Sequence, residues 1–242
     1  MIPKECIIWG GGYSIKEGIS LGLQDHLKGK FVINCNYSFL HFPGTLLTFL
    51  DRDFYVPIQA KEKGNKHPDI YEKLKKIPLI IGIDYNNGVQ EFILPNTILL
   101  KKSVPYNKNP IEKGFYYRSL TGVFSLFLAS FLIDFKGVIY LLGFDETKKT
   151  KEIFLNKRKP HTHYYEEETN HSGIGDVRVY HKSRDRFLPF TKEKDLHIYN
   201  VSPDSNINCF EKIDYTTFFS KLDNVVYEQE NLRKEIKKKL VG

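Results

Sequence analysis

The sequence predicts an α/β fold in which a doubly wound, mostly parallel sheet is flanked by helices. Three observations favour it: apolar runs of strand length alternate with helical segments, a run of glycines directly follows the first apolar run, and a carboxylate ends a later one. With 242 residues the chain is long enough for one large domain with a well-buried core. We therefore expect residues 1–242 to form a single Rossmann-like domain.

The N-terminal part of the chain indicates a strand, a glycine turn, a short helix and a second strand. The apolar run Cys6–Trp9 meets the turn Gly10–Ser14, and the second strand is expected at Phe31–Asn36. Glycines at such a turn let the backbone approach a ligand closely, and the N-terminus of the following helix favours an anion. A nucleotide phosphate is therefore expected there, and the alternative is a tight strand-to-helix turn without a ligand. The residues expected to bind the donor are Gly10, Gly11, Gly12, Ser14, Asn34 and Asn36.

Further strand-like and helical runs follow in alternation. Strands are predicted at residues 44–50, 79–83, 97–100, 137–145 and 196–200, helices at 68–76 and 119–132, a loop at 105–113, and a peripheral charged helix at 225–242. The helix at 119–132 is apolar almost all round, which indicates burial against the sheet. In a parallel sheet of this kind ligands bind beyond the carboxyl ends of the strands, where the residues that end these strands are expected to converge.

Residues 146–195 form a long polar stretch between two of the predicted strands. A stretch of this length without a clear core element is typical of a lid or an active-site insertion. It contains four histidines, and a histidine poised near neutral pH can take a proton from an attacking hydroxyl. A metal site and ordinary loop residues are the alternatives. The histidines are His161, His163, His171 and His181.

Two carboxylate motifs lie at strand ends. Asp51 and Asp53 have the D-x-D spacing at which both carboxylates can face one side of an extended chain and hold a divalent cation. The alternative for this pair is a solvated turn. Asp145 ends an apolar strand, where it is expected to act in catalysis at the donor site or to cap a neighbouring turn by accepting backbone amides.

The composition restricts the classes of partner and location. A formal net charge of +7 suits a polyanionic partner, but the lysines are spread along the chain, so an even basic surface is favoured over a nucleic-acid groove. The three cysteines form no C-x-x-C pair and no even set, which indicates reduced packing residues. No apolar run reaches about 18 residues free of charges, and the N-terminus lacks the pattern of a signal peptide. We therefore expect a cytoplasmic protein with no membrane span.

Five short motifs, taken in order, resemble those of one superfamily. They are Gly10-Gly11-Gly12-Tyr13-Ser14-Ile15-Lys16, which resembles GxGPSLK; Val32–Asn36, which resembles xxxCN; Thr121-Gly122-Val123, which resembles SG(V/A); Ile139–Asp145, which resembles IYLLGFD; and Ile198–Ser205, which resembles xYNxxPxS. Together they are similar to the superfamily shared by bacterial family-42 sialyltransferases, archaeal 6-hydroxymethylpterin diphosphokinase-like proteins and many uncharacterised phage proteins. The phage group is the most similar, because His161-Thr162-His163 resembles its H-x-H motif.

The resemblance implies a Rossmann-like domain that holds a nucleotide donor. In the sialyltransferase branch a cytidine nucleotide is bound by residues that correspond to Gly12, Ser14 and Asn36, and a late histidine is the general base on the acceptor hydroxyl. His171 and His181 are the candidates for that base. The residues that the resemblance further assigns to donor binding are Thr121, Gly122, His161 and His163.

We therefore expect a nucleotide-dependent transferase, first of all a sialyltransferase-like glycosyltransferase that acts on an acceptor hydroxyl. The donor would be a CMP-sugar, another nucleotide sugar or ATP, and the acceptor a small molecule or a glycan. One alternative is a diphosphokinase of the 6-hydroxymethylpterin type, in which Asp51 and Asp53 hold Mg²⁺. Another is a nucleotide- or nucleic-acid-binding viral protein without turnover. Under all of these readings an oligomer is an open alternative to a monomer, and a virus-infected host cell is an open alternative as the location.

Overall fold

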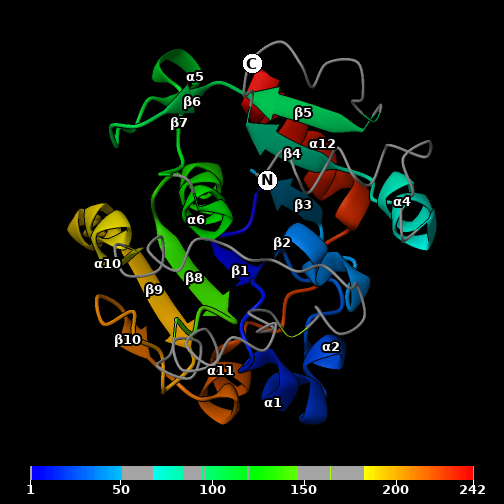
Figure 1. Ribbon diagram of the computed structural model, residues 1–242, viewed down its shortest axis with the longest axis vertical. Coiled ribbons are helices and arrows are strands. Elements are labelled where there is room, and N and C mark those ends of the chain that lie inside the picture. Colours follow the sequence, from blue (N-terminus) through cyan, green and yellow to red (C-terminus); the bar gives the residue numbers. More distant parts are fainter. Residues whose placement is uncertain are drawn as a thin grey trace, which may run out of the picture.

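The computed structural model contains one eight-stranded sheet with helices on both of its faces (Figure 1). The structure describes residues 2–50, 68–83, 94, 96–118, 120–146, 164 and 183–241. The order of the strands is β10-β9-β8-β1-β2-β3-β4-β5, and every neighbouring pair is parallel. The predicted α/β, Rossmann-like fold with a parallel sheet is therefore confirmed.

The strands of the main sheet follow the apolar runs of the sequence. They are β1 (Glu5–Trp9), β2 (Val32–Cys35), β3 (Leu46–Phe49), β4 (Ile80–Ile83), β5 (Thr97–Leu100), β8 (Gly137–Leu142), β9 (Leu196–Val201) and β10 (Glu211–Lys212). A second, smaller sheet pairs β6 (Lys102–Ser103) with β7 (Phe115–Tyr116). Each predicted strand is present, and its observed bounds differ from the expected ones by one to three residues.

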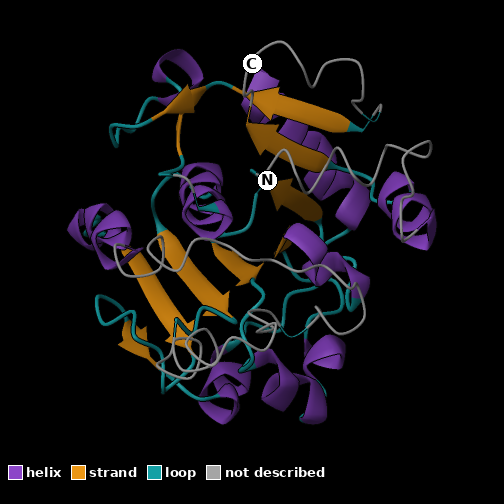
Figure 2. Ribbon diagram, in the orientation of Figure 1, coloured by secondary structure: helices purple, strands orange, loops and turns teal. Residues whose placement is uncertain are grey.

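Helices pack on either side of these strands (Figure 2). They are α1 (Ile15–Ser20), α2 (Leu23–His26), η1 (Asn36–Leu40), α4 (Pro68–Lys75), α5 (Pro110–Lys113), α6 (Thr121–Leu132), α10 (Ser183–Phe187), η4 (Leu188–Lys192), α11 (Tyr215–Lys221) and α12 (Gln229–Val241). The η labels denote 3₁₀ turns. α6 and α4 are the helices predicted at 119–132 and 68–76.

The strand order reverses between β1 and β8. The chain first adds β2 to β5 on one side of β1, and then returns to place β8, β9 and β10 on the other side. In the register of the central strands, Trp9 lies opposite both Asn34 and Leu142. The carboxyl ends of these strands therefore meet at one edge, and such a reversal is where open α/β sheets bind ligands.

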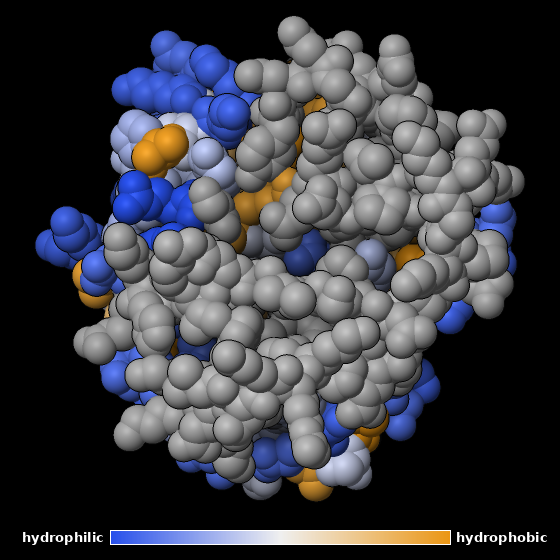
Figure 3. All heavy atoms as spheres, viewed as in Figure 1, coloured by the Kyte–Doolittle hydropathy of each residue, from blue (hydrophilic) through white to orange (hydrophobic). Residues whose placement is uncertain are grey.

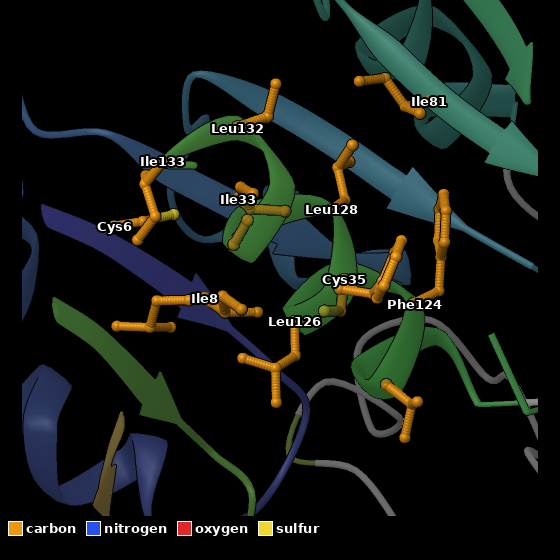
Figure 4. Close-up of a cluster of buried hydrophobic side chains, with 14 of the residues drawn as sticks. Cys6, Ile8, Ile33, Cys35, Ile81, Phe124, Leu126, Leu128, Leu132 and Ile133 are labelled. Atoms are coloured by element: carbon orange, nitrogen blue, oxygen red, sulfur yellow. The ribbon is translucent and has the colours of Figure 1, made fainter. Parts of the chain in front are cut away.

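The central strands are buried on both faces, so their side chains alternate between two apolar layers. On β1, Cys6 and Ile8 belong to the layer that contains α6, α10, η4 and α12, whereas Ile7 and Trp9 belong to the layer of α1, α2, α4 and α11. Figure 4 shows Cys6 and Ile8 facing the apolar side chains of α6. Burial on both faces explains why these strands are continuous apolar runs instead of alternating ones.

Helix α6 is buried almost all round, as its composition predicted. Two of its polar side chains, Ser125 and Ser130, are fully buried, and each hydroxyl donates to a carbonyl one turn earlier, at 2.7 Å. Ser125 also lies 2.7 Å from the Thr48 hydroxyl and 3.1 Å from Cys35 Sγ. The hydroxyls are therefore satisfied inside the apolar layer, and the helix stays close to the sheet.

Three segments differ from the sequence-based expectations. The loop expected at 105–113 contains the short helix α5, and Asn109 precedes its Pro110. In the polar stretch 146–195, the described part includes α10 and η4, whose Phe187 and Phe190 are buried in the core. The C-terminal helix expected at 225–242 begins at Gln229 and buries Leu232, Ile236 and Leu240. Single aromatic residues in a charged segment are a weak sequence signal for such short elements.

None of the helices in the described part of the chain is long and apolar enough to cross a bilayer. On the face seen in Figure 3, the described side chains near the margins are mainly hydrophilic. The large hydrophobic side chains that are exposed are Leu21, Val104, Ile111, Leu188, Val225, Val226 and Val241. They come from several separate elements, which is ordinary for a protein surface.

A group of charged side chains lies at the opposite, amino end of the sheet. Lys30 is buried, and its Nζ donates to Asp223 Oδ1 at 2.8 Å and to Val225 O at 2.9 Å. Tyr227 donates to the other oxygen of Asp223 at 3.1 Å. Glu5, at the start of β1, lies beside this group. Burial, followed by the negative charge of Asp223, raises the pKa of Glu5 from 4.5 to about 7.

This shift predicts a pH dependence of stability. Between pH 4.5 and about 7 the folded chain keeps a proton on Glu5 that the unfolded chain has lost, so the free energy of unfolding falls as the pH rises through this window. Glu5→Gln should remove that loss, and its stability relative to the wild type should be greater at pH 8 than at pH 5. Urea denaturation at the two pH values measures it, with the exposed Glu211→Gln as control. A Glu5→Gln variant with the wild-type pH profile would contradict the prediction.

Candidate functional site

The loops that follow β1 and β8 are bonded to each other at the carboxyl edge of the sheet. Gly10 N donates to Leu142 O at 2.7 Å, and Gly12 N donates to Gly143 O at 2.9 Å. A Cβ at Gly12 would lie 2.6 Å from Gly143 O, so the two backbones approach as closely as glycine allows. The glycines are therefore required by contact between two loops of the protein.

The Asp145 carboxylate also links the loop after β8 to the loop after β1, through Ser14. Ser14 N donates to Asp145 Oδ2 at 2.8 Å, and Ser14 Oγ donates to Asp145 Oδ1 at 2.5 Å. Asp145 is only 7% exposed, and both of its oxygens accept short, charge-assisted hydrogen bonds. Tyr215 of α11 packs beside this pair, where burial and then the charge of Asp145 raise the pKa of its phenol. Asp145 thus holds the start of α1, which is the capping role considered for it.

The glycine turn is therefore occupied by the protein's own anion. The amides of Gly10, Gly12 and Ser14 are all bonded within the chain, and a negative charge lies at the N-terminus of α1. A Cβ at Gly12 would also lie 2.6 Å from Asp145 Cγ. A larger residue there would disturb the loop with or without a ligand. A phosphate against this turn stays a prediction, and these contacts favour the alternative of a tight structural turn.

The two asparagines expected near the donor have different surroundings. Asn34 is buried, its Nδ2 donates to Ser38 Oγ at 3.2 Å, and its Oδ1 accepts from Gly44 N at 2.7 Å. Both ends of that carboxamide hold the connection from β2 to β3. Asn36 instead reaches the start of α6, where the Thr121 hydroxyl lies 3.4 Å from its Oδ1. Asn36 and Thr121 therefore lie close together, and their assignment to donor binding stays a prediction.

At the N-terminus of α6, none of the residues that the structure describes supplies a side-chain cap. Gly122, in its first turn, packs against Phe144, because a Cβ there would lie 2.6 Å from Phe144 Cε1. The first amides of a helix have no partner within it, and together with the helix dipole they favour an anion. α6 runs from Thr121 to Leu132, long enough to align many peptide dipoles.

One arginine precedes this helix in the chain, and a second interacts with the first electrostatically. Arg118 is exposed and precedes Thr121 in the chain, and Arg186 comes from α10, where its carbonyl accepts from Tyr116 Oη at 3.2 Å. Neither guanidinium forms a salt bridge with a described carboxylate, and Arg186 Nη1 is buried without a described hydrogen-bond partner. Burial, followed by repulsion from Arg118, lowers the pKa of Arg186, while Glu146 opposes the shift. The region is therefore positively charged and suited to an anion.

Left-handed backbone also gathers around this helix end. Among the described residues other than glycine, positive φ angles occur at Asn36 (49°), Arg118 (45°) and Glu146 (42°), and at Asp134 and Phe135 beyond the other end of α6. A bulky residue in this conformation is uncommon and persists only where tertiary contacts hold it. The first three end β2, precede α6 and follow β8, so they border the same edge of the sheet.

Aromatic side chains line the glycine turn on its other side. Trp9 is fully buried, and its Nε1 donates to Tyr164 Oη at 3.0 Å. The backbone of Tyr164 donates to Gly11 O at 3.0 Å, and its ring contacts His41 at a centroid distance of 4.8 Å. Tyr164, a residue of the stretch 146–195, is therefore hydrogen-bonded both to the turn and to the tryptophan before it. The sequence analysis missed this contact, and its one signal was the single tryptophan placed directly before three glycines.

Several predicted site residues lie outside the described residues, and their assignments stay predictions. They are the proposed metal ligands Asp51 and Asp53 and the histidines His161, His163, His171 and His181. Within the described part of the chain, no group of three or more His, Cys, Asp or Glu side chains could hold a metal ion. Among the described residues, the features suited to an anion are the N-terminus of α6, Arg118 and Arg186.

No family model and no curated protein matches the chain. Among solved structures, the chain is similar to one described as the sialyltransferase CstII from Campylobacter jejuni in complex with a substrate analogue, CMP-3FNeuAc. The TM-score is 0.40 and the identity 16%, over 93% of this chain and 87% of that one. A likeness of this strength establishes neither a family nor an activity.

The hydrogen bond between Ser14 and Asp145 predicts that substitutions of the two side chains have coupled effects on stability. Ser14→Ala and Asp145→Asn should each lower the free energy of unfolding by about 1–3 kcal/mol, because hydrogen bonds to a buried carboxylate are lost. The double variant should be less destabilised than the sum of the two, since both remove the same contact. Urea denaturation of the four proteins measures the coupling.

An exposed carboxylate supplies the control for this cycle. Asp204→Asn, in the loop after β9, should be additive with Ser14→Ala. Additivity in the Ser14 and Asp145 cycle as well would show that the carboxylate does not hold the turn.

Proposed function

We propose that the chain is a nucleotide-dependent transferase that binds its donor phosphate at the N-terminus of α6, with Arg118 and Arg186 as the cationic side chains. The observation that supports this proposal is the N-terminus of α6 at the point of strand-order reversal, which has no side-chain cap among the described residues, together with two arginines that repel each other and have no described salt-bridge partner. The amides and the guanidinium groups act together there, because each favours a negatively charged group. The glycine turn then shapes the edge of the site and does not bind the phosphate.

The proposed reaction is transfer of a glycosyl group to an acceptor hydroxyl. The hydroxyl oxygen attacks the anomeric carbon, the bond from that carbon to the phosphate oxygen breaks, and the nucleotide leaves with the bonding electrons. A histidine of the stretch 146–195 takes the hydroxyl proton, with His171 and His181 as the candidates from the resemblance. The cations beside α6 stabilise the negative charge that the leaving phosphate gains.

The donor class is tested first by binding. The only tryptophan, Trp9, lies at the end of β1 directly before the glycine turn, so its fluorescence reports on this edge of the sheet. CMP, UDP and ATP are titrated with and without Mg²⁺, and CMP comes first because the motifs resemble those of the sialyltransferase branch, which binds a cytidine nucleotide. Saturable binding of one nucleotide supports the proposal, and binding that needs Mg²⁺ favours the diphosphokinase alternative. Binding of none overturns the proposal.

Arg118→Ala should weaken the binding of that nucleotide. Loss of a charge-assisted hydrogen bond to a phosphate corresponds to about 1.5–3 kcal/mol, or a rise of about tenfold to one hundredfold in Kd. Titration of Trp9 fluorescence measures it. The control is Arg233→Ala, since Arg233 lies on α12, away from the carboxyl edge of the sheet. Equal Kd values for the two variants would place the phosphate elsewhere.

A further inference from the structure

Residues 222–228 connect two helices that pack on opposite faces of the sheet (Figure 1). Phe218 of α11 belongs to the layer of α1, whereas Leu232 of α12 belongs to the layer of α6. The connection therefore crosses the amino end of the sheet, beside the start of β1. Val225 is 50% exposed and Val226 72% exposed, so burial of apolar surface adds little to its attachment.

Polar contacts with the loop before β2 hold this connection. Lys30 Nζ donates to Asp223 O, to Asp223 Oδ1 at 2.8 Å and to Val225 O at 2.9 Å. Tyr227 N donates to Gly29 O at 2.8 Å, and Tyr227 Oη donates to Asp223 Oδ2 at 3.1 Å. Lys30 is only 7% exposed, so its ammonium group depends on these acceptors as much as they depend on it.

The helices on either side of the connection are attached independently of Lys30 Nζ. In α11, the ring of Phe219 stacks on that of His26 at a centroid distance of 4.0 Å. In α12, Gln229 Oε1 accepts from Thr45 Oγ1 at 2.8 Å, and the apolar side chains of the following turns are buried in the core. Residues 222–228 can therefore detach while both helices stay packed.

Glu5 is an acidic side chain in contact with this connection. Its Oε2 accepts from Asp223 N at 3.4 Å, and no described cation forms a salt bridge with it. Burial, then the charge of Asp223, raises its pKa to about 7. A charge on Glu5 is therefore disfavoured while the connection is closed. The titratable and charged groups that interact with Glu5 are Asp223 and Tyr227 on the connection, Lys30 before β2, Tyr140 on β8 and Cys6 on β1.

We propose that Glu5 and Lys30 form a proton-sensitive latch on residues 222–228, which is closed while Glu5 is protonated and opens locally when Glu5 loses its proton. When the connection opens, water reaches the Glu5 carboxylate and it ionises as an ordinary glutamate does. The closed state thus keeps a proton that the open state releases, so a rise in pH from 6 to 8 favours opening by up to about tenfold. This latch goes beyond the proposed transferase function and does not depend on where a donor binds.

Hydrogen exchange of the intact protein measures the opening, read as protection factors of the amides of residues 222–228 at pH 6 and pH 8. A protection factor is taken relative to an unfolded chain at the same pH, so the effect of pH on the exchange chemistry cancels. The wild-type factors should fall about threefold to tenfold from pH 6 to pH 8, and those of Glu5→Gln should stay within about twofold. The exposed Glu211→Gln is the matched control and should fall as the wild type does.

Two further measurements separate a local latch from unfolding of the whole chain. The protection factors of residues 222–228 should lie at least about tenfold below those of β8 and should hardly change in about 1 M urea, because a local opening exposes little surface. Tyr227→Phe, which loses the bond to Asp223, should lower protection of the connection about threefold to tenfold at both pH values.

Three results would overturn the latch. The first is equal protection and equal urea dependence of residues 222–228 and β8, since the connection would then open only with the whole chain. The second is wild-type protection that does not fall between pH 6 and pH 8, or a Glu5→Gln variant that keeps the wild-type fall. The third is a Tyr227→Phe variant with wild-type protection, because the contacts with Asp223 would then not hold the connection.

Discussion

The edge of the sheet is organised by the contact between the Asp145 carboxylate and Ser14, which joins residues 131 positions apart in the chain. The carboxylate reaches the start of α1 because the glycines let the loops after β1 and β8 approach each other closely. Its burial is tolerated because each oxygen accepts a hydrogen bond. The start of α1 therefore faces a negative charge that belongs to the protein itself.

That charge decides where an external anion can bind. α1 extends over only six residues, and its N-terminus already faces Asp145, so a phosphate there would be repelled. α6 extends over twelve residues, has no side-chain cap from the described part of the chain, and begins shortly after Arg118. The two helix ends therefore have opposite electrostatic character, although they lie at the same edge of the sheet. An anionic donor would be oriented by this difference, with its negative group toward α6.

The sequence allowed the sheet and its central helix to be predicted, because strands buried on both faces are continuous apolar runs and α6 is apolar almost all round. The elements β6, β7 and β10 have two residues each, too few to produce a periodic pattern. Asp145 was identified at its strand end, but the residue it bonds could not be, because that contact exists only once β1 and β8 are neighbours. Arg118 was not singled out, because one exposed arginine after two tyrosines has no distinguishing sequence signal.

Three residues with positive φ angles also shape this edge of the sheet. Asn36, Arg118 and Glu146 belong to three separate connections. An asparagine adopts this conformation fairly readily, but the local sequence does not favour it at Arg118 or Glu146. Their conformations are held by contacts from elsewhere, as the loop after β9 holds Glu146. The shape of this edge, where we propose an anion site, is therefore a property of the assembled sheet. A glycine turn can be recognised in a sequence, but whether it receives a ligand or a carboxylate of the same chain depends on which loop the fold places beside it.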